Sequence, residues 1–466
     1  MLYKKNDRLI TTIDVLGING EGIVKSTSPI LFVPYALPKE KVEVQILKVL
    51  KNVMYAKLIK VIEPSAERVK PVCKVFEKCG GCQLQHLSYK EQLQFKTNMV
   101  AETLKKVGNI GFDVNSCTPS ANQYEYRNKI SLPVRKVNGE LKIGFFTFNS
   151  HDIIEINSCP LQQEKTNRLI KLFKGFMTQY GIEAYDETSN SGLVKHLVAR
   201  EGEDGLIVTV VINGNTMPNL NDLKTMLKNE FNNFGLYLNI NTQNNNVILS
   251  EKSVFAGGEE YLVEEQNGIT VKTASVSFMQ VNNDIRNKIY SRIIEMINFK
   301  NPSTVIDAYS GAGLLTGILA KNTNAKVYGL EIVKEAIESA DQMLKDNNLT
   351  NRVTNILGDC AVTLPKLMEE VNGDVSLVVD PPRKGLDRSI ISGILKSKPS
   401  QIVYLACGLS ALARDLGYLL NTKDLDETKN VLNPKPIYKI KSVTPYDMFP
   451  QTKHVETLVE LVRIKE

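Results

Sequence analysis

The segment Thr304-Val-Ile-Asp-Ala-Tyr-Ser-Gly-Ala-Gly-Leu-Leu-Thr-Gly317 has the pattern of a buried β-strand, a glycine-rich turn and the start of a helix. Glycines in such a turn let a ligand lie directly against the backbone. The next predicted strand ends at Glu331, where a carboxylate can accept hydrogen bonds from both hydroxyls of a ribose. The two strands therefore predict a nucleoside-binding half of an α/β sheet.

The spacing of these glycines is unlike that of a dinucleotide-binding fingerprint. Gly311 and Gly313 are followed by Gly317 instead of by a glycine three positions on, and no second nucleotide-binding half follows. Asp307, the glycines and Glu331 together resemble the motif of class I S-adenosylmethionine-dependent methyltransferases, in which no phosphate is bound. A turn with a purely structural role is the alternative.

Strands and helices alternate through the C-terminal part of the chain, which predicts a largely parallel sheet with helices on both faces. Its strands are expected at Thr304–Ala308, Lys326–Glu331, Ser376–Asp380, Ile402–Ala406 and Glu456–Val462. Over the whole chain the predicted fold class is multidomain α/β. A small OB-like β-barrel, a mixed α+β central domain and a C-terminal Rossmann-like domain are expected in that order.

Two residues expected at the carboxyl edge of this sheet could bind a ligand or react with a substrate. Asp380 stands before two prolines, which end the strand, and therefore is expected to face a bound ligand. Cys407 precedes Gly408 in the turn after another strand, where a thiolate could meet a substrate, although buried cysteines are more often structural. Glu456 adds a carboxylate beside the last predicted strand and would by itself be an ordinary surface acid.

The composition fits several domains and a polyanionic partner. The chain has 466 residues, 42% of them hydrophobic and 23% charged, which is enough for more than one core. Residues 1–106 hold 18 Lys and Arg against 10 Asp and Glu, whereas the rest is close to neutral. Such a local excess favours nucleic acid as a partner, although a solvated basic face would have the same composition.

Three domains are expected. Residues 1–63 are predicted to form a small antiparallel barrel, either an OB-like RNA-binding module or a solubilising β-domain. Its expected strands are Leu9–Val15, Gly17–Gly22, Ile30–Val33, Val42–Leu47 and Tyr55–Val61. Residues 276–466 are predicted to be the domain that carries the chemistry.

Residues 64–275 are predicted to form the central α+β domain. A capping box at Ser88 and Glu91 indicates a helix over 88–107, which could pack on the C-terminal domain. The other elements expected are strands at Lys129–Val134, Lys142–Thr147, Leu206–Ile212 and Asn246–Leu249, and helices near Pro160–Phe176 and Asn219–Phe231.

Four of the seven cysteines form a candidate ligand set, Cys73, Cys79, Cys82 and Cys159. Such a tetrathiolate could hold zinc or a [4Fe–4S] cluster, and the spacing does not decide between them. Cys117 and Cys360 match no motif and are expected in the core. The odd cysteine number and the absence of a secretory pattern argue against a disulfide framework. No apolar run reaches the roughly 18 residues needed to cross a bilayer, so a cytoplasmic location without a membrane partner is expected.

Five motifs resemble those of the S-adenosylmethionine-dependent RNA uracil-5-methyltransferases and occur in the same order. They are Ser277-Phe-Met-Gln280-Val-Asn282, Asp307-Ala-Tyr309-Ser-Gly311-Ala-Gly313, Asp380-Pro-Pro-Arg-Lys-Gly385, Ala406-Cys407 with Leu412-Ala-Arg-Asp415, and Asp447-Met-Phe-Pro-Gln-Thr-Lys-His-Val-Glu456. The N-terminal barrel resembles a TRAM domain, so the similarity extends over nearly the whole chain.

The resemblance implies a reaction and the residues that perform it. Cys407 would be the nucleophile that adds to carbon 6 of uracil, and Glu456 the general base that removes the proton from carbon 5. The residues implied to line the S-adenosylmethionine pocket are Gln280, Tyr309, Glu331 and Asp380.

The resemblance also implies a cluster and a class of RNA. Ribosomal RNA members of the family carry a [4Fe–4S] cluster on this cysteine pattern, so the four candidate cysteines are expected to hold that cluster instead of zinc. The tRNA-specific relatives typically lack both the N-terminal module and the cysteines, so the expected substrate is 23S rRNA. The enzyme is also expected to be a monomer.

The chain departs from the family around the nucleophile. Where Ser-Cys-Asn-Pro is common, it has Ala406-Cys407-Gly408-Leu409, which predicts a looser loop. Three alternatives stay open: methylation of uridine in tRNA, methylation of an exocyclic amino group through Asp380-Pro-Pro with Cys407 structural, and an RNA-binding protein with a vestigial cofactor fold.

Overall fold

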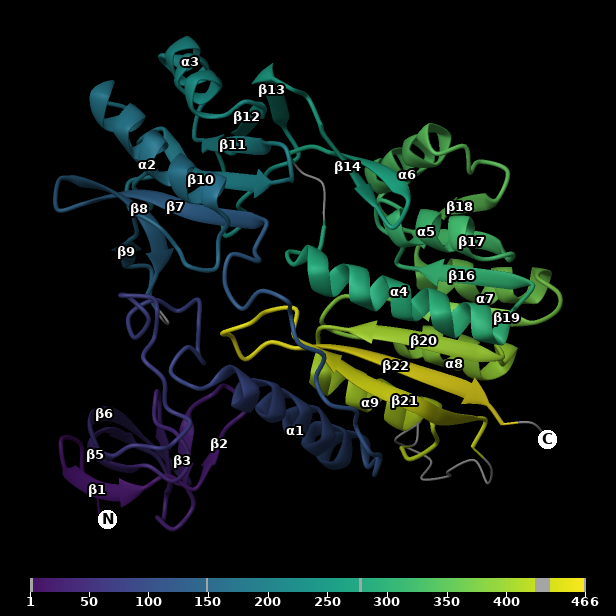
Figure 1. The fold of residues 1–466 in the computed structure, drawn as a ribbon, viewed down its shortest axis with the longest axis horizontal. Coiled ribbons are helices and arrows are strands. Elements are labelled where there is room, and N and C mark those ends of the chain that lie inside the picture. Colours follow the sequence, from purple (N-terminus) through teal and green to yellow (C-terminus); the bar gives the residue numbers. More distant parts are fainter. Residues whose placement is uncertain (1–2, 148–149, 276–278, 424–435, 465–466) are drawn as a thin grey trace.

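The computed structural model describes residues 3–147, 150–275, 279–423 and 436–464. Its strands form a six-stranded N-terminal sheet, a seven-stranded central sheet, a two-stranded hairpin and a seven-stranded C-terminal sheet (Figure 1). Helices accompany the two larger sheets, so the predicted multidomain α/β class is confirmed. Residues 276–278, which hold the start of the first family motif and the predicted domain boundary, lie outside the described residues.

The N-terminal sheet encloses a small apolar core. Alternate residues of its longest strands point inward, among them Val42, Val44 and Ile46. Its strands are β1 (Arg8–Thr12), β2 (Val15–Leu16), β3 (Gly22–Val24), β4 (Ile30–Val33), β5 (Lys41–Val49) and β6 (Val53–Glu63), in the order β1-β5-β6-β4-β3-β2. The pairing of β4 with β6 is parallel, so the sheet is not purely antiparallel as predicted.

The strand predicted at Gly17–Gly22 is wrong. The N–H of Gly17 donates to the carbonyl of Glu21 at 2.7 Å, and the N–H of Gly20 donates to the carbonyl of Gly17 at 2.9 Å. These short-range bonds close a turn between β2 and β3, and Gly20 takes the positive φ of 84° that such a turn needs.

The central sheet is covered on one face by two helices. Alternate residues of β11, from Leu206 to Ile212, share one core with Phe173 of α2 and Leu223 of α3. The elements are β7 (Lys129–Val137), β8 (Glu140–Phe146), β9 (Ile153–Glu155), α2 (Glu164–Gln179), β10 (Val194–Glu201), β11 (Leu206–Ile212), α3 (Leu220–Glu230), β12 (Phe234–Ile240) and β13 (Ser253–Gly258). The strand predicted at Asn246–Leu249 is wrong, because these residues form the β12–β13 connection, where Asn241 Nδ2 donates to the carbonyls of Val247 and Ile248.

The C-terminal sheet is largely parallel, as predicted, and has helices on both faces. Its order is β18-β17-β16-β19-β20-β22-β21, and only the pairings made by β22 are antiparallel. The strands are β16 (Thr304–Ala308), β17 (Lys326–Glu331), β18 (Val353–Leu357), β19 (Val375–Val379), β20 (Gln401–Ala406), β21 (Tyr438–Tyr446) and β22 (Glu456–Arg463). Sequence reasoning missed β18 and β21.

Two apolar cores lie on opposite faces of this sheet. One contains α4 (Asn283–Lys300), α5 (Leu314–Asn322) and α6 (Lys334–Asp346). The other contains α7 (Cys360–Glu370), α8 (Arg388–Ser397) and α9 (Leu409–Leu419). The hairpin of β14 (Leu262–Gln266) and β15 (Ile269–Thr273) joins the first core, since Ile269 is buried in it. None of the helices in the described ranges has both the length and the apolar content that a membrane crossing requires.

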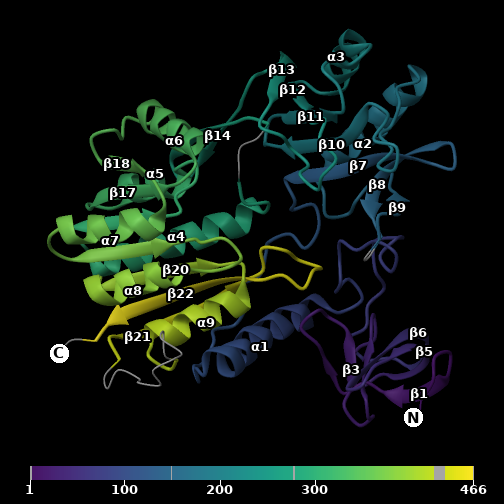
Figure 2. The ribbon, with the colours of Figure 1, turned by 180° about the vertical axis from the view of Figure 1, so that it is seen from behind.

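Helix α1 (Tyr89–Gly108) lies alongside α9 (Figures 1 and 2). It buries Val100 and Leu104 in the core that contains α7, α8 and α9. Ser88 Oγ caps it by accepting from the N–H of Glu91 at 3.4 Å. The reciprocal bond of the predicted capping box is absent from the described contacts, because the Ser88 N–H donates to the carbonyl of Glu67 at 2.9 Å.

A buried ion pair fastens α1 to the connection between β21 and β22. Lys96 Nζ contacts Asp447 Oδ1 and also donates to the carbonyl of Phe449 at 3.1 Å, and neither charged side chain is exposed. Burial of both charges is tolerable only while they are paired.

Replacing Lys96 with methionine is therefore expected to lower the free energy of unfolding by about 3–5 kcal/mol, because the Asp447 carboxylate is left buried without its partner. Urea denaturation would measure the loss. Lys90→Met, at an exposed position of the same helix, is the control and should cost little. Equal losses in the two variants would contradict the prediction.

Candidate active site

The carboxyl ends of four parallel strands bring predicted site residues to one edge of the C-terminal sheet. β16 lies between β17 and β19, so the connections that follow β16 and β19 run toward opposite sides of the sheet. Open α/β sheets bind ligands in the crevice between such diverging connections. Tyr309 follows β16, Glu331 ends β17, Asp380 follows β19 and Cys407 follows β20. The structure therefore gathers four of the predicted residues along one edge.

The glycine-rich turn after β16 has a left-handed backbone. Tyr309, Gly311 and Gly313 have φ values of 66°, 56° and 80°. A Cβ placed on Gly311 would meet nothing within 4 Å, so this face of the turn is open to a ligand. A Cβ on Gly313 would lie 2.6 Å from Cβ of Ala340, so glycine is needed there for α6 to pack against the turn.

Glu331 is held in place by backbone N–H groups. Its Oε2 accepts from Gly311 at 2.9 Å, and its Oε1 accepts from Ile332 and Val333 at 2.9 Å each. A carboxylate has about four acceptor positions, so Oε2 keeps capacity for a ribose hydroxyl. The acceptor is thus oriented before any ligand binds.

Apolar side chains flank this carboxylate. Ile332, the residue after Glu331, is 62% exposed. Leu357, which is paired with Glu331 in the β17–β18 ladder, is 50% exposed. Exposed apolar groups beside a ribose acceptor provide a surface for a flat base. Sequence reasoning missed both residues, although an apolar residue directly after an acidic strand end was a usable signal.

Two carboxyl groups lie below the crevice. Thr316 Oγ1 donates to Asp307 Oδ2 at 2.6 Å, and burial, reinforced by the charge of Glu331, raises the pKa of Asp307 to about 7. Burial and then the charge of Asp307 raise the pKa of Asp380 to about 7 as well. Both groups therefore titrate near neutral pH.

Cys407 and Glu456 come together through the register of two antiparallel strands. In the β20–β22 ladder Ala406 is paired with Thr457, so the next position outward places Cys407 opposite Glu456. Cys407 is partly exposed, whereas Glu456 is buried. The thiol and the carboxyl group thus share the edge that holds Glu331 and Asp380.

The charges around this pair act on both groups. Burial raises the pKa of the Cys407 thiol, the negative charges of Glu456 and Asp380 raise it further, and Arg383 lowers it. Burial raises the pKa of Glu456 well above its usual value, Asp380 adds to the shift and Arg383 opposes it. Arg383, from the Asp380 motif, is thus the cation that favours both the thiolate and the carboxylate.

Tyr290 on α4 also belongs to this site, and sequence reasoning missed it. Its side chain is buried, and its pKa is raised first by burial and then by the charge of Asp380, with smaller effects of Asp307 and Glu456. The phenol therefore stays protonated and is available as a hydrogen-bond donor beside the carboxyl groups. In the sequence, the position of Tyr290 in the apolar pattern of the helix indicates only a core residue.

Gln280 is the one predicted pocket residue that does not stand at or directly after the end of a strand of the C-terminal sheet. Its carbonyl accepts from Asn128 Nδ2 at 3.0 Å, just before α4 begins. Its side chain makes no hydrogen bond to another described residue.

The connection that carries Cys407 is short and tightly packed, in contrast to the looser loop predicted. Only Cys407 and Gly408 separate β20 from α9. A Cβ on Gly408 would overlap the carbonyl oxygen of Arg383, so glycine allows two motif loops to touch. The Cys407 and Arg383 loops are therefore joined by a close backbone contact.

Gly408→Ala is expected to push the Cys407 and Arg383 loops apart and to slow the reaction at this site by about 10- to 100-fold, the usual scale for displaced catalytic groups. Initial rates would measure this. Gly175→Ala is the control, since a Cβ there would meet nothing within 4 Å. A Gly408→Ala enzyme with unchanged rate would show that the contact has no role.

The raised pKa of the Cys407 thiol predicts a pH dependence for reactions of this residue. A thiol whose pKa lies above its usual value is mostly protonated at neutral pH, and its reactive thiolate increases about tenfold per pH unit up to that pKa. The rate at which a thiol reagent alkylates Cys407 should therefore rise steadily from pH 6.5 to 8.5. A rate that is constant over this range would contradict the prediction.

The four candidate ligand cysteines line one cavity of about 340 Å³, which also reaches Arg383 and His454. All four thiols are free, and burial raises the pKa of Cys82 to about 12 and that of Cys159 to about 11. In the described part of the chain, no three His, Cys, Asp or Glu side chains are arranged to hold a single metal ion. Four thiols around a shared cavity nevertheless fit the donor set of an iron–sulfur cluster. Cys117 and Cys360 are buried, as predicted.

A largely parallel sheet with an oriented carboxylate at its edge and a cysteine–carboxylate pair beside it fits the class of S-adenosylmethionine-dependent methyltransferases, and the comparisons show that class. A family model described as tRNA (uracil-5-)-methyltransferase matches residues 88–464. The chain belongs to this family, and it is an RNA (uracil-5-)-methyltransferase.

Curated relatives and a solved structure match nearly the whole chain. An uncharacterized RNA methyltransferase of Clostridium tetani is 37% identical over 460 residues, which cover 98% of this chain and 96% of that protein. Another from Clostridium acetobutylicum is 38% identical over 467 residues, which cover 99% and 98% of the two chains.

The solved structure is the Pyrococcus abyssi tRNA (uracil-54, C5)-methyltransferase in complex with S-adenosyl-L-homocysteine. It has a TM-score of 0.76 and 25% identity, and the match covers 97% of this chain and 99% of that chain. A tRNA enzyme therefore matches the N-terminal part too, so that part does not by itself exclude tRNA as the substrate.

Proposed function

We propose that this enzyme methylates carbon 5 of a uridine in 23S rRNA through a covalent bond between Cys407 and carbon 6 of the uracil. The observation that carries the mechanism is the register that sets Cys407 opposite Glu456, beside the nucleoside-binding edge. A cysteine and a carboxyl group at one site provide the nucleophile and the base that this chemistry needs.

Each residue has a defined step. The Cys407 thiolate forms a bond to carbon 6, which turns the ring into an enolate whose carbon 5 is nucleophilic. S-adenosylmethionine, when bound, supplies an electrophilic methyl group, and carbon 5 takes that methyl as the sulfonium bond breaks. Glu456 then removes the proton from carbon 5, the carbon 6–sulfur bond breaks and the thiolate leaves.

The pocket for the methyl donor is proposed to include Glu331 and Tyr309, with Asp380 on its other side and Gln280 approaching from the start of α4. Glu331 supports this role because backbone N–H groups already orient its carboxylate. Tyr309 is held with a positive φ of 66°, the type of strained conformation that clusters at ligand sites.

An RNA that carries 5-fluorouridine at the target position tests the mechanism. Fluorine cannot leave carbon 5 as a proton would, so the enzyme should be trapped as a methylated adduct through Cys407 that survives denaturing electrophoresis. Amino-group methylation would give no such adduct. A protein that bound RNA but took up no labelled methyl group would instead be a binding protein.

The choice of 23S rRNA over tRNA rests on the set of four cysteines, whereas the N-terminal sheet supports RNA binding in general. We propose that residues 1–63 form a TRAM module that binds RNA, followed by a central domain (64–275) and a Rossmann-like catalytic domain (276–466). A stacked pair, Phe32 and Tyr55 with ring centroids 5.6 Å apart, supports RNA binding by this module, because Tyr55 is exposed beside lysines.

Uridine in tRNA is the second candidate, because the Pyrococcus abyssi enzyme is described as acting on tRNA. Mapping 5-methyluridine in 23S rRNA and in tRNA, from cells with and without this protein, separates the two. Loss of the modification from 23S rRNA is expected. Its loss from tRNA alone would favour the second candidate.

We also propose that Cys73, Cys79, Cys82 and Cys159 hold a [4Fe–4S] cluster. Methyl transfer needs no electrons, so the cluster is assigned to shaping the fold and the RNA surface. Protein purified without oxygen should be brown and contain iron and sulfide, and Cys79→Ser should reduce the iron content. One zinc per chain without iron would overturn the assignment.

A further inference from the structure

The β21–β22 loop, residues 447–455, carries Glu456 at its end and is held by a reciprocal pair of glutamine side chains. Gln92 Nε2 donates to Gln451 Oε1 at 3.0 Å, and Gln92 Oε1 accepts from the backbone N–H of Gln451 at 3.0 Å. Both residues are 1% exposed. Amide groups this deeply buried are retained only where their hydrogen bonds are made.

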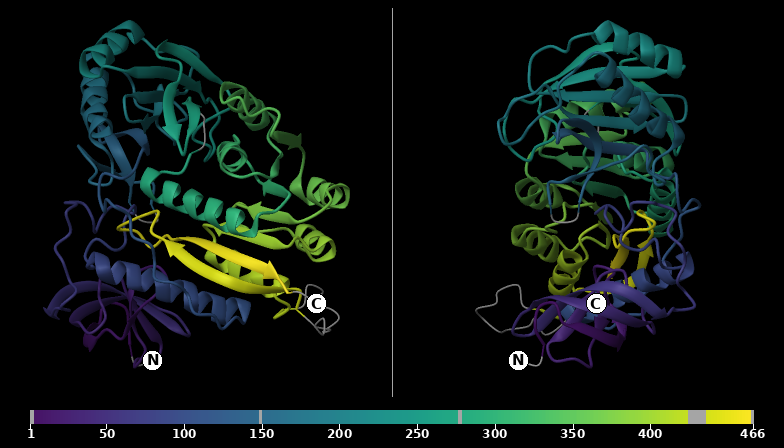
Figure 3. Two further views of the ribbon diagram at one scale, coloured as in Figure 1. Left: turned by 45° about the vertical axis from the view of Figure 1, so that its right-hand side comes forward. Right: turned by 90° about the vertical axis from the view of Figure 1, so that its left-hand side faces the viewer.

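The same glutamines bind the cysteine segment, residues 64–88. Gln92 Nε2 also donates to the carbonyls of Leu84 and Leu87, at 3.1 and 2.9 Å. The carbonyl of Gln451 accepts from the N–H groups of Gln83 and Leu84, at 3.1 and 3.0 Å. Figure 3 shows this loop, in yellow, reaching from the C-terminal sheet to the dark blue cysteine segment.

Gln451 has a backbone conformation that needs such support. Its φ is 70°, in the left-handed region that non-glycine residues rarely adopt because it is strained. The hydrogen bonds of the Gln451 side chain, N–H and carbonyl together hold the residue in this conformation. The strained φ therefore indicates that these bonds fix the position of the loop.

The loop between Gln451 and Glu456 is bonded to itself. Thr452 Oγ1 donates to the carbonyl of Phe449 at 2.9 Å and accepts from the N–H of His454 at 3.3 Å. Glu456 then begins β22 at the outermost rung of its ladder with β21, opposite Tyr446. A displacement of Gln451 would therefore also displace Glu456, the first residue of β22.

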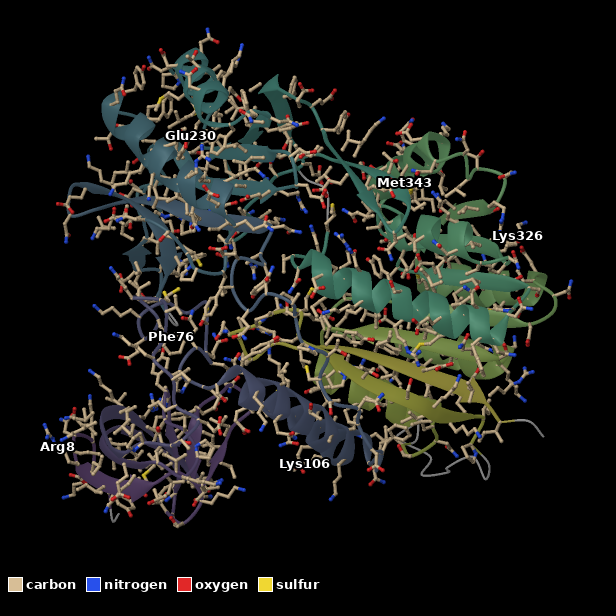
Figure 4. The ribbon with its side chains drawn as sticks, in the orientation of Figure 1. Arg8, Phe76, Lys106, Glu230, Lys326 and Met343 are labelled. Carbon is tan, nitrogen blue, oxygen red and sulfur yellow. The ribbon has the colours of Figure 1, made fainter. Side chains whose placement is uncertain are left out.

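The segment that holds Gln451 is in turn packed against the N-terminal sheet. Phe76, labelled in Figure 4, lies between that sheet and the central one, with its ring 5.3 Å from that of Tyr35. Lys453 Nζ also donates to Asn19 Oδ1 at 2.6 Å. The loop is thus fixed to elements outside the sheet that carries Glu456.

We propose that Gln92 and Gln451 are positioning residues that set Glu456 for removal of the proton from carbon 5. The inference rests on the proposed function. Addition of Cys407 and transfer of the methyl group do not use Glu456, so loss of the glutamine pair should affect the last step alone. The expected signature is a methylated RNA–enzyme adduct that accumulates with ordinary uridine.

Gln92→Met tests this, because methionine has the same length and no amide. Turnover should fall about 10- to 100-fold, and an adduct carrying labelled methyl should appear with unmodified RNA. Trapping by 5-fluorouridine RNA should keep the wild-type rate, which a merely misfolded variant could not do. The control is Gln94→Met, on the exposed side of the same helix, which should behave as wild type in both assays.

Gln451→Gly provides a second variant, since glycine accepts the positive φ and only the side-chain bond is lost. A smaller fall in turnover with the same adduct is expected. Wild-type turnover of Gln92→Met, or equal losses of turnover and trapping without an adduct, would overturn the inference. Failure of the wild-type enzyme to be trapped at all would instead overturn the proposed function.

Discussion

Cys407→Ala is expected to lose methyl transfer to RNA by roughly 10⁶-fold, the scale of loss when a catalytic nucleophile is removed. Without addition at carbon 6, carbon 5 of uracil is too weak a nucleophile to take the methyl group. Transfer of labelled methyl from S-adenosylmethionine to RNA would measure the loss, and trapping by 5-fluorouridine RNA should also disappear.

Cys117→Ala is the matched control for this variant. Its thiol is buried in the apolar core that contains α1 and α9, and Cys117 contributes a backbone N–H to Thr97 Oγ1 that alanine retains. Activity of the control should be close to that of wild type. Normal methylation by Cys407→Ala would show that the reaction does not pass through this thiol.

Glu456→Gln is expected to stop the reaction after methyl transfer, with turnover reduced by about 10²- to 10⁴-fold. Glutamine has nearly the same shape but cannot take the proton from carbon 5, so the methylated RNA should remain bonded to Cys407. Denaturing electrophoresis with labelled S-adenosylmethionine and unmodified RNA would show the adduct.

The stability of Glu456→Gln separates this effect from misfolding. The pKa of Glu456 is raised in the folded state, so the stability of the wild-type protein falls as the pH rises from the ordinary carboxyl pKa to the raised one, and the neutral glutamine variant should be at least as stable at pH 8. Glu369→Gln, at an exposed carboxylate of α7, is the control. Rapid release of methylated RNA by Glu456→Gln would exclude Glu456 as the base.

Four strands have the bounds predicted from the sequence: Ile30–Val33, Leu206–Ile212, Thr304–Ala308 and Lys326–Glu331. Leu206–Ile212 and Thr304–Ala308 are buried throughout, and strands covered on both faces are easy to locate because they appear as apolar runs between turn residues. Val353–Leu357 and Tyr438–Tyr446, the two edge strands of the C-terminal sheet, mix polar and apolar residues and gave no such run.

The same difference applies to the site. Glu331, Asp380 and Cys407 could be found because each stands at the end of a strand, where topology assembles ligand sites. Gln92 could not, because its partner Gln451 lies 359 residues away and its helical spacing indicates only a core position. Pairs of this kind become visible only when the packing of distant segments is known.

The place of β22 in the sheet has a consequence for biosynthesis. β22 lies between β20 and β21, and it begins with Glu456. A growing chain that has not yet reached residue 456 therefore holds Cys407 but lacks Glu456, and it also lacks the strand that pairs with β20. The edge of the sheet that gathers the site residues is thus complete only after β22 has been translated and inserted.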